Sequence, residues 1–138
     1  MYRLTRDVRY LQQAHKIAAF ILNHPRLPAD KIPYWDFDDP KIPDTYRDAS
    51  AGSIIASALL ELALFSDKKE KKNYIETAEK ILMTLSGENY RAKPGENGGF
   101  LLKHSAGALP FNSEVDVALT YADYYFLEAL KRYQDWHL

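Results

Sequence analysis

The side chains that could do chemistry begin in one loop-like stretch, residues 34–50, YWDFDDPKIPDTYRDAS. It places Trp35 beside three acids, Asp36, Asp38 and Asp39. Paired carboxylates can act as a general acid and a general base, but consecutive acids in a loop are more often solvated residues of turns. A tryptophan ring in a polar loop can stack on a sugar ring or pack against its own loop. These residues alone leave both pairs of alternatives open.

The end of the same stretch, Arg47-Asp48-Ala49-Ser50, comes directly before a long apolar run. Asp48 or Ser50 can cap the N-terminus of a helix at this point, since both residue types are preferred there. The free amide groups and the dipole of that helix end, beside Arg47, would also attract an anion such as the carboxylate of a uronic acid. A structural cap and an anion contact are therefore both open at this position.

Metal and phosphate chemistry finds little support. Of four histidines, only His104 lies in a loop on the predicted pocket side, and no two have the spacing of metal ligands with acids. The glycine-rich PGENGGF, residues 94–100, matches no phosphate-binding loop and indicates a turn before a strand. No Ser-His-Asp arrangement can be defended. We expect no metal and no cofactor, and these residues by themselves assign no mechanism.

The composition excludes several classes of protein. The 138 residues carry 18 Lys and Arg against 19 Asp and Glu, a formal net charge of −1, without the basic cluster that binds nucleic acid. The absence of cysteine excludes disulfides and thiolate chemistry. The first residues, MYRLTRDVRYLQQAHK, are charged and periodic, unlike a signal peptide or a membrane anchor. We expect a cytoplasmic location, with no nucleic-acid or membrane partner.

Four helices are predicted to position the candidate residues. Apolar residues recur at helical spacing over 7–23, residues 50–65 are apolar on nearly every side, and residues 68–86 are amphipathic. A fourth, aromatic-rich helix is predicted over 113–133, opened by SEVD, which has the form of a capping box. The order along the chain is therefore amphipathic, buried, amphipathic, buried.

This order predicts an all-α fold that is a slice of an α/α barrel. A helix that is apolar all round must be surrounded by protein, and four helices would struggle to cover two such members. A short connection makes the second and third helices antiparallel neighbours. The long loops 24–49 and 87–112 then emerge at one end, where PYWDF and GGFLLKHS would pair as a small β-ribbon. Long loops at one end of a helical scaffold favour a binding pocket.

Three stretches together resemble one family. They are Tyr34-Trp35-Asp36-Phe37, Arg47-Asp48-Ala49-Ser50-Ala51 and the segment from Asp123 to Leu130. With the spacing between them, they resemble the unsaturated glucuronyl hydrolases, glycoside hydrolase family 88, over residues 5–133. The family reads Arg-Asp-Ser-Ser-Ala in the second stretch, so Ala49 replaces its first serine.

The resemblance implies an (α/α)6 barrel and an enzyme that removes a 4,5-unsaturated uronic acid from oligosaccharides left by polysaccharide lyases. In such enzymes an aspartic acid protonates C4 and activates water for C5, so the vinyl ether bond is hydrated and the resulting hemiketal collapses. This differs from displacement at an anomeric carbon by two carboxylates. The chain corresponds to roughly the last third of the family. Residues 1–138 are therefore expected to form a single C-terminal segment, and no catalytic aspartate can be carried over onto them.

By this resemblance we expect the pocket rim to be lined by Trp35, Arg47, Asp48, His104 and Ser105. The expected partners are an unsaturated oligosaccharide, together with the catalytic N-terminal part of the enzyme or a second copy of the chain that covers exposed inner helices. A second function stays open, namely a non-catalytic helical module that binds acidic sugars or a partner protein.

Overall fold

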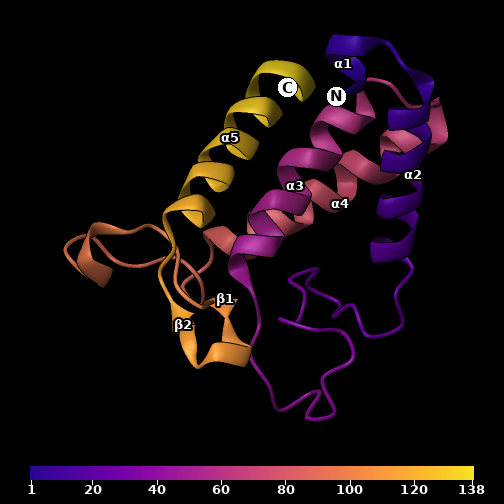
Figure 1. The fold of residues 1–138 in the computed structure, drawn as a ribbon. Helices are drawn as coiled ribbons and strands as arrows, with labels where there is room; N and C mark the ends of the chain where they lie inside the picture. The colour runs from indigo at the N-terminus through magenta and orange to yellow at the C-terminus, as the bar shows by residue number, and fades with distance from the viewer.

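The computed structural model describes residues 1–138 as five helices and one two-stranded antiparallel sheet (Figure 1). The α-helices are α1 (Tyr2–Thr5), α2 (Val8–Leu22), α3 (Ala49–Ala63), α4 (Lys68–Ser86) and α5 (Thr120–His137). The strands are β1 (Ser105–Ala108) and β2 (Ser113–Val117), with 3-10 turns η1 (Asn97–Gly99) and η2 (Leu109–Phe111). The predicted mostly helical fold with one small sheet is confirmed.

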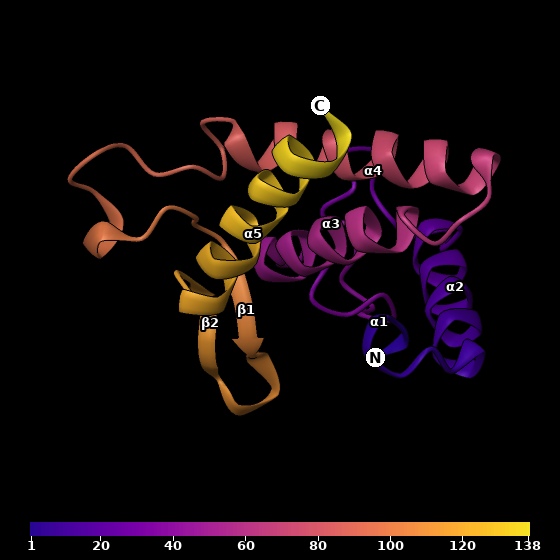
Figure 2. The same ribbon diagram turned by 90° about the horizontal axis from the view of Figure 1, so that it is seen from above.

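Helix α3 forms the centre of the core. Ten of its 15 residues are buried, because small residues and leucines surround its axis and let other helices approach from several sides. Helices α4 and α5 both pack along it, as Figure 2 shows, and α4 runs antiparallel to it after a short turn. None of the helices combines the length and the apolar character that crossing a membrane requires.

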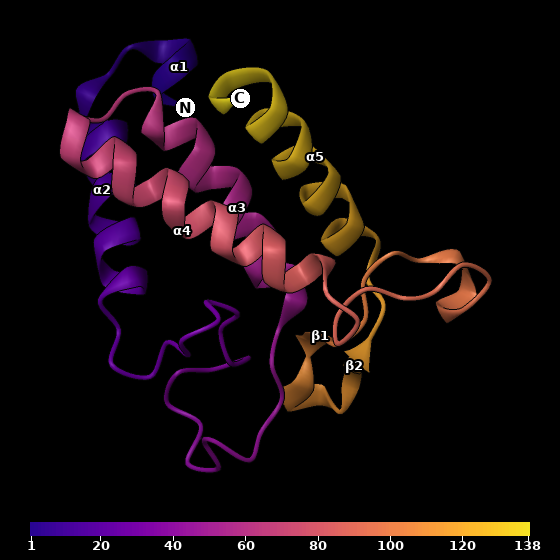
Figure 3. The ribbon, with the colours of Figure 1, turned by 180° about the vertical axis from the view of Figure 1, so that it is seen from behind.

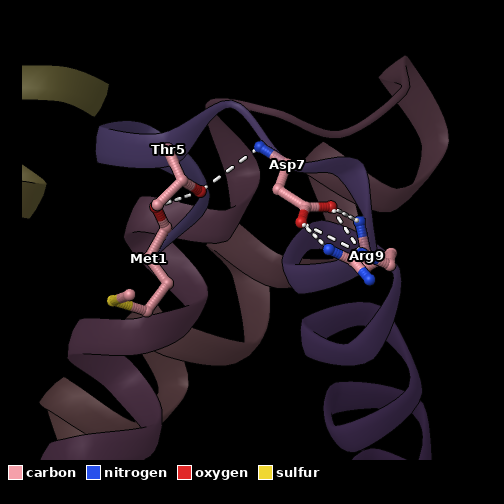
Figure 4. Close-up of polar contacts among 4 residues, drawn as sticks. All are labelled: Met1, Thr5, Asp7 and Arg9. Atoms are coloured by element: carbon pink, nitrogen blue, oxygen red, sulfur yellow. Dashed lines mark hydrogen bonds and ion pairs between the residues drawn. The ribbon is translucent and has the colours of Figure 1, made fainter.

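Side-chain caps fix the helices that periodicity predicted. Asp7 begins α2, where its carboxylate accepts the amide of Arg9 at 3.0 Å and pairs with the Arg9 guanidinium at 2.6 Å (Figure 4). Thr5 braces this turn by accepting the Asp7 amide at 3.2 Å. Asp67 caps α4 through the amides of residues 69 and 70, and α4 ends at Gly87 as predicted.

The predicted fourth helix is wrong at its start. Residues Ser113–Val117 form β2, and α5 begins only at Thr120. Glu114 and Asp116 have φ of 51° and 54°, which a right-handed helix does not allow. The backbone of this segment pairs instead with β1, so the SEVD pattern caps nothing, and α5 begins without a side-chain cap.

The small ribbon is present, but between partners other than those predicted. β1 pairs with β2 in the register Ser105↔Val117, Ala106↔Val115 and Ala108↔Ser113, with an irregularity after the first pair. PYWDF and GGFLLKHS do not pair with each other. Tyr34 bridges Arg47, and Leu102 bridges Arg91, each within its own loop. Local pairing closes a short loop, which costs less conformational entropy than joining two distant loops.

Both long loops nevertheless gather at one end of the helices, as predicted. Figure 3 shows the loop that follows α2 and the β1–β2 ribbon at the N-terminal ends of α3 and α5. The amide of Ala49 donates to the carbonyl of His104 at 3.0 Å, which joins the first loop to the start of the ribbon. The hydroxyl of Thr84 donates to the carbonyl of Asp30 at 3.1 Å and ties the first loop to α4.

Helix α5 is only partly covered. Its buried residues are Ala122, Phe126 and Ala129. Four of its other large side chains are between 38% and 59% exposed, namely Tyr121, Tyr124, Leu127 and Leu130. Apolar and aromatic side chains therefore form an uncovered face on α5.

Candidate functional site

Asp48 lies where the loop enters α3, and it caps the helix. Its Oδ1 accepts the amide of Ser50 at 2.9 Å and the Ser50 hydroxyl at 2.6 Å. The same oxygen accepts the amide of Ala106 in β1 at 3.3 Å. The buried carboxylate therefore joins the helix end to the ribbon. The capping interpretation is confirmed, and the negative charge that favours a helix N-terminus is supplied by the chain itself.

The guanidinium of Arg47 is bound by groups of its own loop. Its Nε donates to the carbonyl of Ile32 at 3.0 Å, and one terminal nitrogen contacts the same carbonyl and the carboxylate of Asp30. The guanidinium carbon lies 5.1 Å from the centre of the Tyr34 ring, within cation–π range. The side chain is 24% exposed. Arg47 thus holds the two ends of the 30–47 loop together.

Asp39 organises the loop around Trp35. Its carboxylate accepts the Thr45 hydroxyl at 2.6 Å, the Lys41 amide at 2.8 Å and the indole N–H of Trp35. These hydrogen bonds, the one from Thr45 first, hold the pKa of Asp39 below its usual value. Asp36 accepts the amide of residue 38 at 2.9 Å, as acids in turns commonly do. The loop acids therefore act as turn residues and anchors.

His104 and Ser105 begin the ribbon in contrasting surroundings. The Nδ1 of His104 lies 2.7 Å from Asp116 Oδ1, and both side chains are 45% exposed. The imidazole also meets Tyr90 edge to face, with 6.1 Å between ring centres. Ser105 is completely buried, and its hydroxyl oxygen has no hydrogen-bond partner. In this conformation Ser105 cannot touch a sugar.

Helix α5 adds a residue that the sequence did not single out. A Cβ placed on Gly107 would lie 3.1 Å from the hydroxyl oxygen of Tyr121, so Tyr121 reaches over the ribbon. Desolvation by burial raises the pKa of the Tyr121 phenol. The Ser50 hydroxyl opposes this increase, and the carboxylates of Asp48 and Glu114 add to it. The phenol therefore stays protonated at neutral pH.

The structure brings four of the five predicted rim residues into one connected set. Arg47 and Asp48 are adjacent, Asp48 binds the ribbon, and His104 and Ser105 open that ribbon. Trp35 lies on the same loop and borders a hollow of about 570 Å³ that Leu109 of η2 also lines. No group of three or more His, Cys, Asp or Glu side chains is placed to hold a metal ion.

Three residues near the candidate site were not predicted from the sequence: Asp116, Tyr121 and Tyr46. Asp116 lies in the segment that the sequence predicts to be helical, and its pairing with His104 depends on the strand that forms there instead. Tyr121 and Tyr46 lie near the site, but tyrosine is frequent along the whole chain, 10 of 138 residues, so type alone did not mark them.

An apolar groove runs along another face of the molecule. It measures about 630 Å³ and is lined from α1, α2, α3 and α5, with Ile17, Ile54 and Tyr124 among its apolar residues. Polar side chains line one part of this groove. Arg132 pairs with Glu61 at 2.9 Å and donates to the carbonyl of Ser57 at 2.8 Å. This groove shares no lining residue with the hollow beside Trp35.

Comparison with known proteins places the chain beside one group of enzymes. No family model matches it. It is 48% identical over 134 residues to an unsaturated glucuronyl hydrolase of Formosa agariphila. The matched residues make up 97% of this chain and 33% of that protein.

Solved structures agree. The crystal structure of an unsaturated glucuronyl hydrolase specific for heparin superposes with a TM-score of 0.93 and 56% identity, over 97% of this chain and 36% of the other. The unsaturated glucuronyl hydrolase of Bacillus sp. GL1, responsible for the degradation of glycosaminoglycan, superposes with a TM-score of 0.85 and 29% identity. The match covers 97% of this chain and 35% of the other. The chain thus spans about a third of the length of the proteins it matches, and the resemblance to unsaturated glucuronyl hydrolases is confirmed for a segment.

Proposed function

We propose that residues 1–138 are a C-terminal segment of a glycoside hydrolase that removes 4,5-unsaturated uronic acid from lyase-generated oligosaccharides by hydration of the vinyl ether. The similarity to unsaturated glucuronyl hydrolases over nearly the whole chain is the observation that carries this conclusion. The proton donor for C4 would belong to residues outside these 138, so this segment supplies one wall of the pocket.

In this proposal the segment is a slice of an (α/α)6 barrel, with α3 and α5 as inner helices and α2 and α4 as outer ones. The burial of α3 on most sides supports this arrangement. The uncovered apolar face of α5 supports it too, because an inner helix of a complete barrel has an inner neighbour on each side. The catalytic N-terminal part would cover that face.

The rim residues divide by what their side chains can reach. Trp35 and His104 keep exposed surface at the loop end and would contact sugar. Asp116 accepts from one imidazole nitrogen of His104, which orients the ring and leaves the other nitrogen for a sugar hydroxyl or carboxylate. Arg47 and Asp48 would act by holding the loop and the ribbon in place, and Ser105 lies buried beneath them.

A chimera tests the proposal. This chain would replace the matching third of the Formosa agariphila enzyme, and turnover of an unsaturated disaccharide would be followed as loss of absorbance from its C4=C5 bond. We expect the chimera to be active and the 138-residue chain alone to be inactive. The Formosa agariphila enzyme with that third deleted is the matched control, and it should be inactive as well.

Two outcomes would contradict the proposal. A chimera that folds but does not turn over substrate would argue for a non-catalytic module that binds acidic sugars or a partner protein. Turnover by the pure 138-residue chain would show that the proton donor lies inside it, contrary to the placement proposed above.

A further inference from the structure

The loop that follows α2 folds back on itself and sorts its side chains onto two faces. Tyr34 bridges Arg47, and the amide of Trp35 donates to the carbonyl of Tyr46 at 3.1 Å. In an antiparallel pair, opposed residues share a face and successive residues alternate between faces. Tyr34 and Arg47 share one face, as their cation–π contact shows. Trp35 and Tyr46 therefore share the other.

A hollow of about 570 Å³ borders this second pair of aromatic residues. Its size falls within the range of small-molecule sites. Apart from Trp35 and Tyr46, its walls come from the loop residues 39, 41 and 43–45 and from Leu109 in the turn of the ribbon. Two segments distant in the sequence, the loop and the ribbon turn, thus border the same hollow.

The Trp35 ring is fixed in place by a buried anchor. Asp39 is 7% exposed, and its carboxylate accepts the indole N–H of Trp35. The same carboxylate is held by the Thr45 hydroxyl at 2.6 Å and the Lys41 amide at 2.8 Å. Because the only donor of the indole is used inside the loop, the ring has only its apolar surface to offer a ligand. A ring fixed before binding loses little freedom on binding.

Tyr46 differs from Trp35 in having a free polar end. The residue is 45% exposed, and no hydrogen bond engages its hydroxyl within the chain. Lys41 and Asp44, both exposed, place one positive and one negative group at the same hollow. The hollow therefore offers two aromatic rings with several polar groups and no excess of positive charge.

We propose that this hollow is a sugar subsite that takes one neutral pyranose ring. The rings of Trp35 and Tyr46 would contact the C–H surface of the sugar, since such surfaces are apolar and flat enough for an aromatic ring. The Tyr46 hydroxyl, Lys41 and Asp44 would hydrogen-bond its hydroxyl groups.

The charges favour a neutral ring over an acidic one. Lys41 is balanced by Asp44, and the carboxylate of Asp39 adds a further negative charge. In the enzyme proposed above, on which this placement rests, the ring would be a saturated sugar on the leaving side of the unsaturated uronic acid. The binding itself requires no unsaturated sugar.

The test uses the 138-residue chain and cellobiose, a neutral disaccharide without an unsaturated ring. The chain has two tryptophans, so Trp136→Phe leaves Trp35 as the sole fluorescent indole. We expect a saturable change in its emission at millimolar cellobiose. In this background Tyr46→Ala should weaken binding by about tenfold, the equivalent of one lost contact of 1.4 kcal/mol.

The matched control is Phe111→Ala. It removes an aromatic ring that is 85% exposed in the same ribbon turn but does not line the hollow. The Phe111→Ala variant should bind cellobiose with unchanged affinity. Circular dichroism checks that every variant keeps its helices. If Tyr46→Ala does not fold, Leu109→Ala, which removes a side chain that lines the hollow from the ribbon turn, takes its place with the same expected loss.

Three results would overturn the subsite. The first is no saturable change with cellobiose, and the second is an equal affinity in the wall variants and in Phe111→Ala. The third is tighter binding of a saturated disaccharide that carries a uronic acid. An active chimera without cellobiose binding would refute only the subsite, whereas cellobiose binding with an inactive chimera would refute only the proposed hydrolase.

Discussion

Removal of the Asp48 carboxylate should destabilise α3 and the ribbon together. Asp48→Ala deletes the acceptor for the Ser50 amide at 2.9 Å, the Ser50 hydroxyl at 2.6 Å and the Ala106 amide at 3.3 Å. Loss of an N-cap costs about 1 kcal/mol. Ser50 is 3% exposed, and a buried donor left without a partner costs about 1–3 kcal/mol. The expected loss of unfolding free energy is therefore about 2–4 kcal/mol.

Urea unfolding followed by circular dichroism measures this loss, provided that the slope against urea concentration is unchanged. Asp48→Asn is the matched control. Its amide oxygen can accept the same hydrogen bonds, and asparagine caps helices as well as aspartate does, so it should lose less than about 1 kcal/mol. Hydrogen exchange of the Ala106 amide gives a local readout, with protection lost in Asp48→Ala and kept in Asp48→Asn.

A loss below about 0.5 kcal/mol in Asp48→Ala, the scale of ordinary surface substitutions, would refute this reasoning if the Ala106 amide also stayed protected. If Asp48→Asn were as damaging as Asp48→Ala, the interaction of the negative charge with the α3 dipole would be responsible, and the hydrogen bonds would not.

Three further results are expected. Arg47→Ala should lower the unfolding free energy by about 1–3 kcal/mol, because it leaves the Ile32 carbonyl without its donor; normal urea stability with lost chimera activity would instead make Arg47 a substrate contact. The pKa of Asp39 is depressed, chiefly by the Thr45 hydroxyl, so the stability it adds is present above the usual value of 3.8 and is lost as pH falls through the lower folded pKa. Tryptophan fluorescence should report this acid transition, and Asp39→Asn should abolish it. The isolated chain should self-associate through the open faces of α2 and α5, and a monodisperse monomer that binds no hydrophobic dye would contradict the slice-of-a-barrel arrangement.

Long apolar patterns predicted the helices well. The segment predicted as 7–23 forms α2 from Val8 to Leu22, and the buried helix begins at Ala49, one residue before its predicted start. The start of α5 failed because a four-residue capping pattern carries little information. Val115 and Val117 are β-branched residues that suit a strand, and the partner in β1 decided the conformation.

The candidate site was predictable at the level of loops and not of contacts. Alternating helix directions placed both long loops at one end without any knowledge of their conformation. The role of Asp39 depends on bonds to residues two to six positions away in a tight irregular turn, which no periodic pattern encodes. The pairing of His104 with Asp116 depends on the β1–β2 ribbon, which the sequence assigned to other partners.

An anion site at the N-terminus of α3 was one of two interpretations of the Arg47-Asp48 pair, and the contacts now favour the other. The carboxylate of Asp48 already accepts the amide of Ser50, the second residue of α3, so a second negative group there would meet a like charge. The guanidinium of Arg47 is engaged by Asp30 and the Ile32 carbonyl. The aromatic rings beside the hollow and the imidazole of His104 keep exposed surface at this end. We infer that this segment holds the neutral part of a sugar chain, and that recognition of the uronic acid charge belongs mainly to residues outside it.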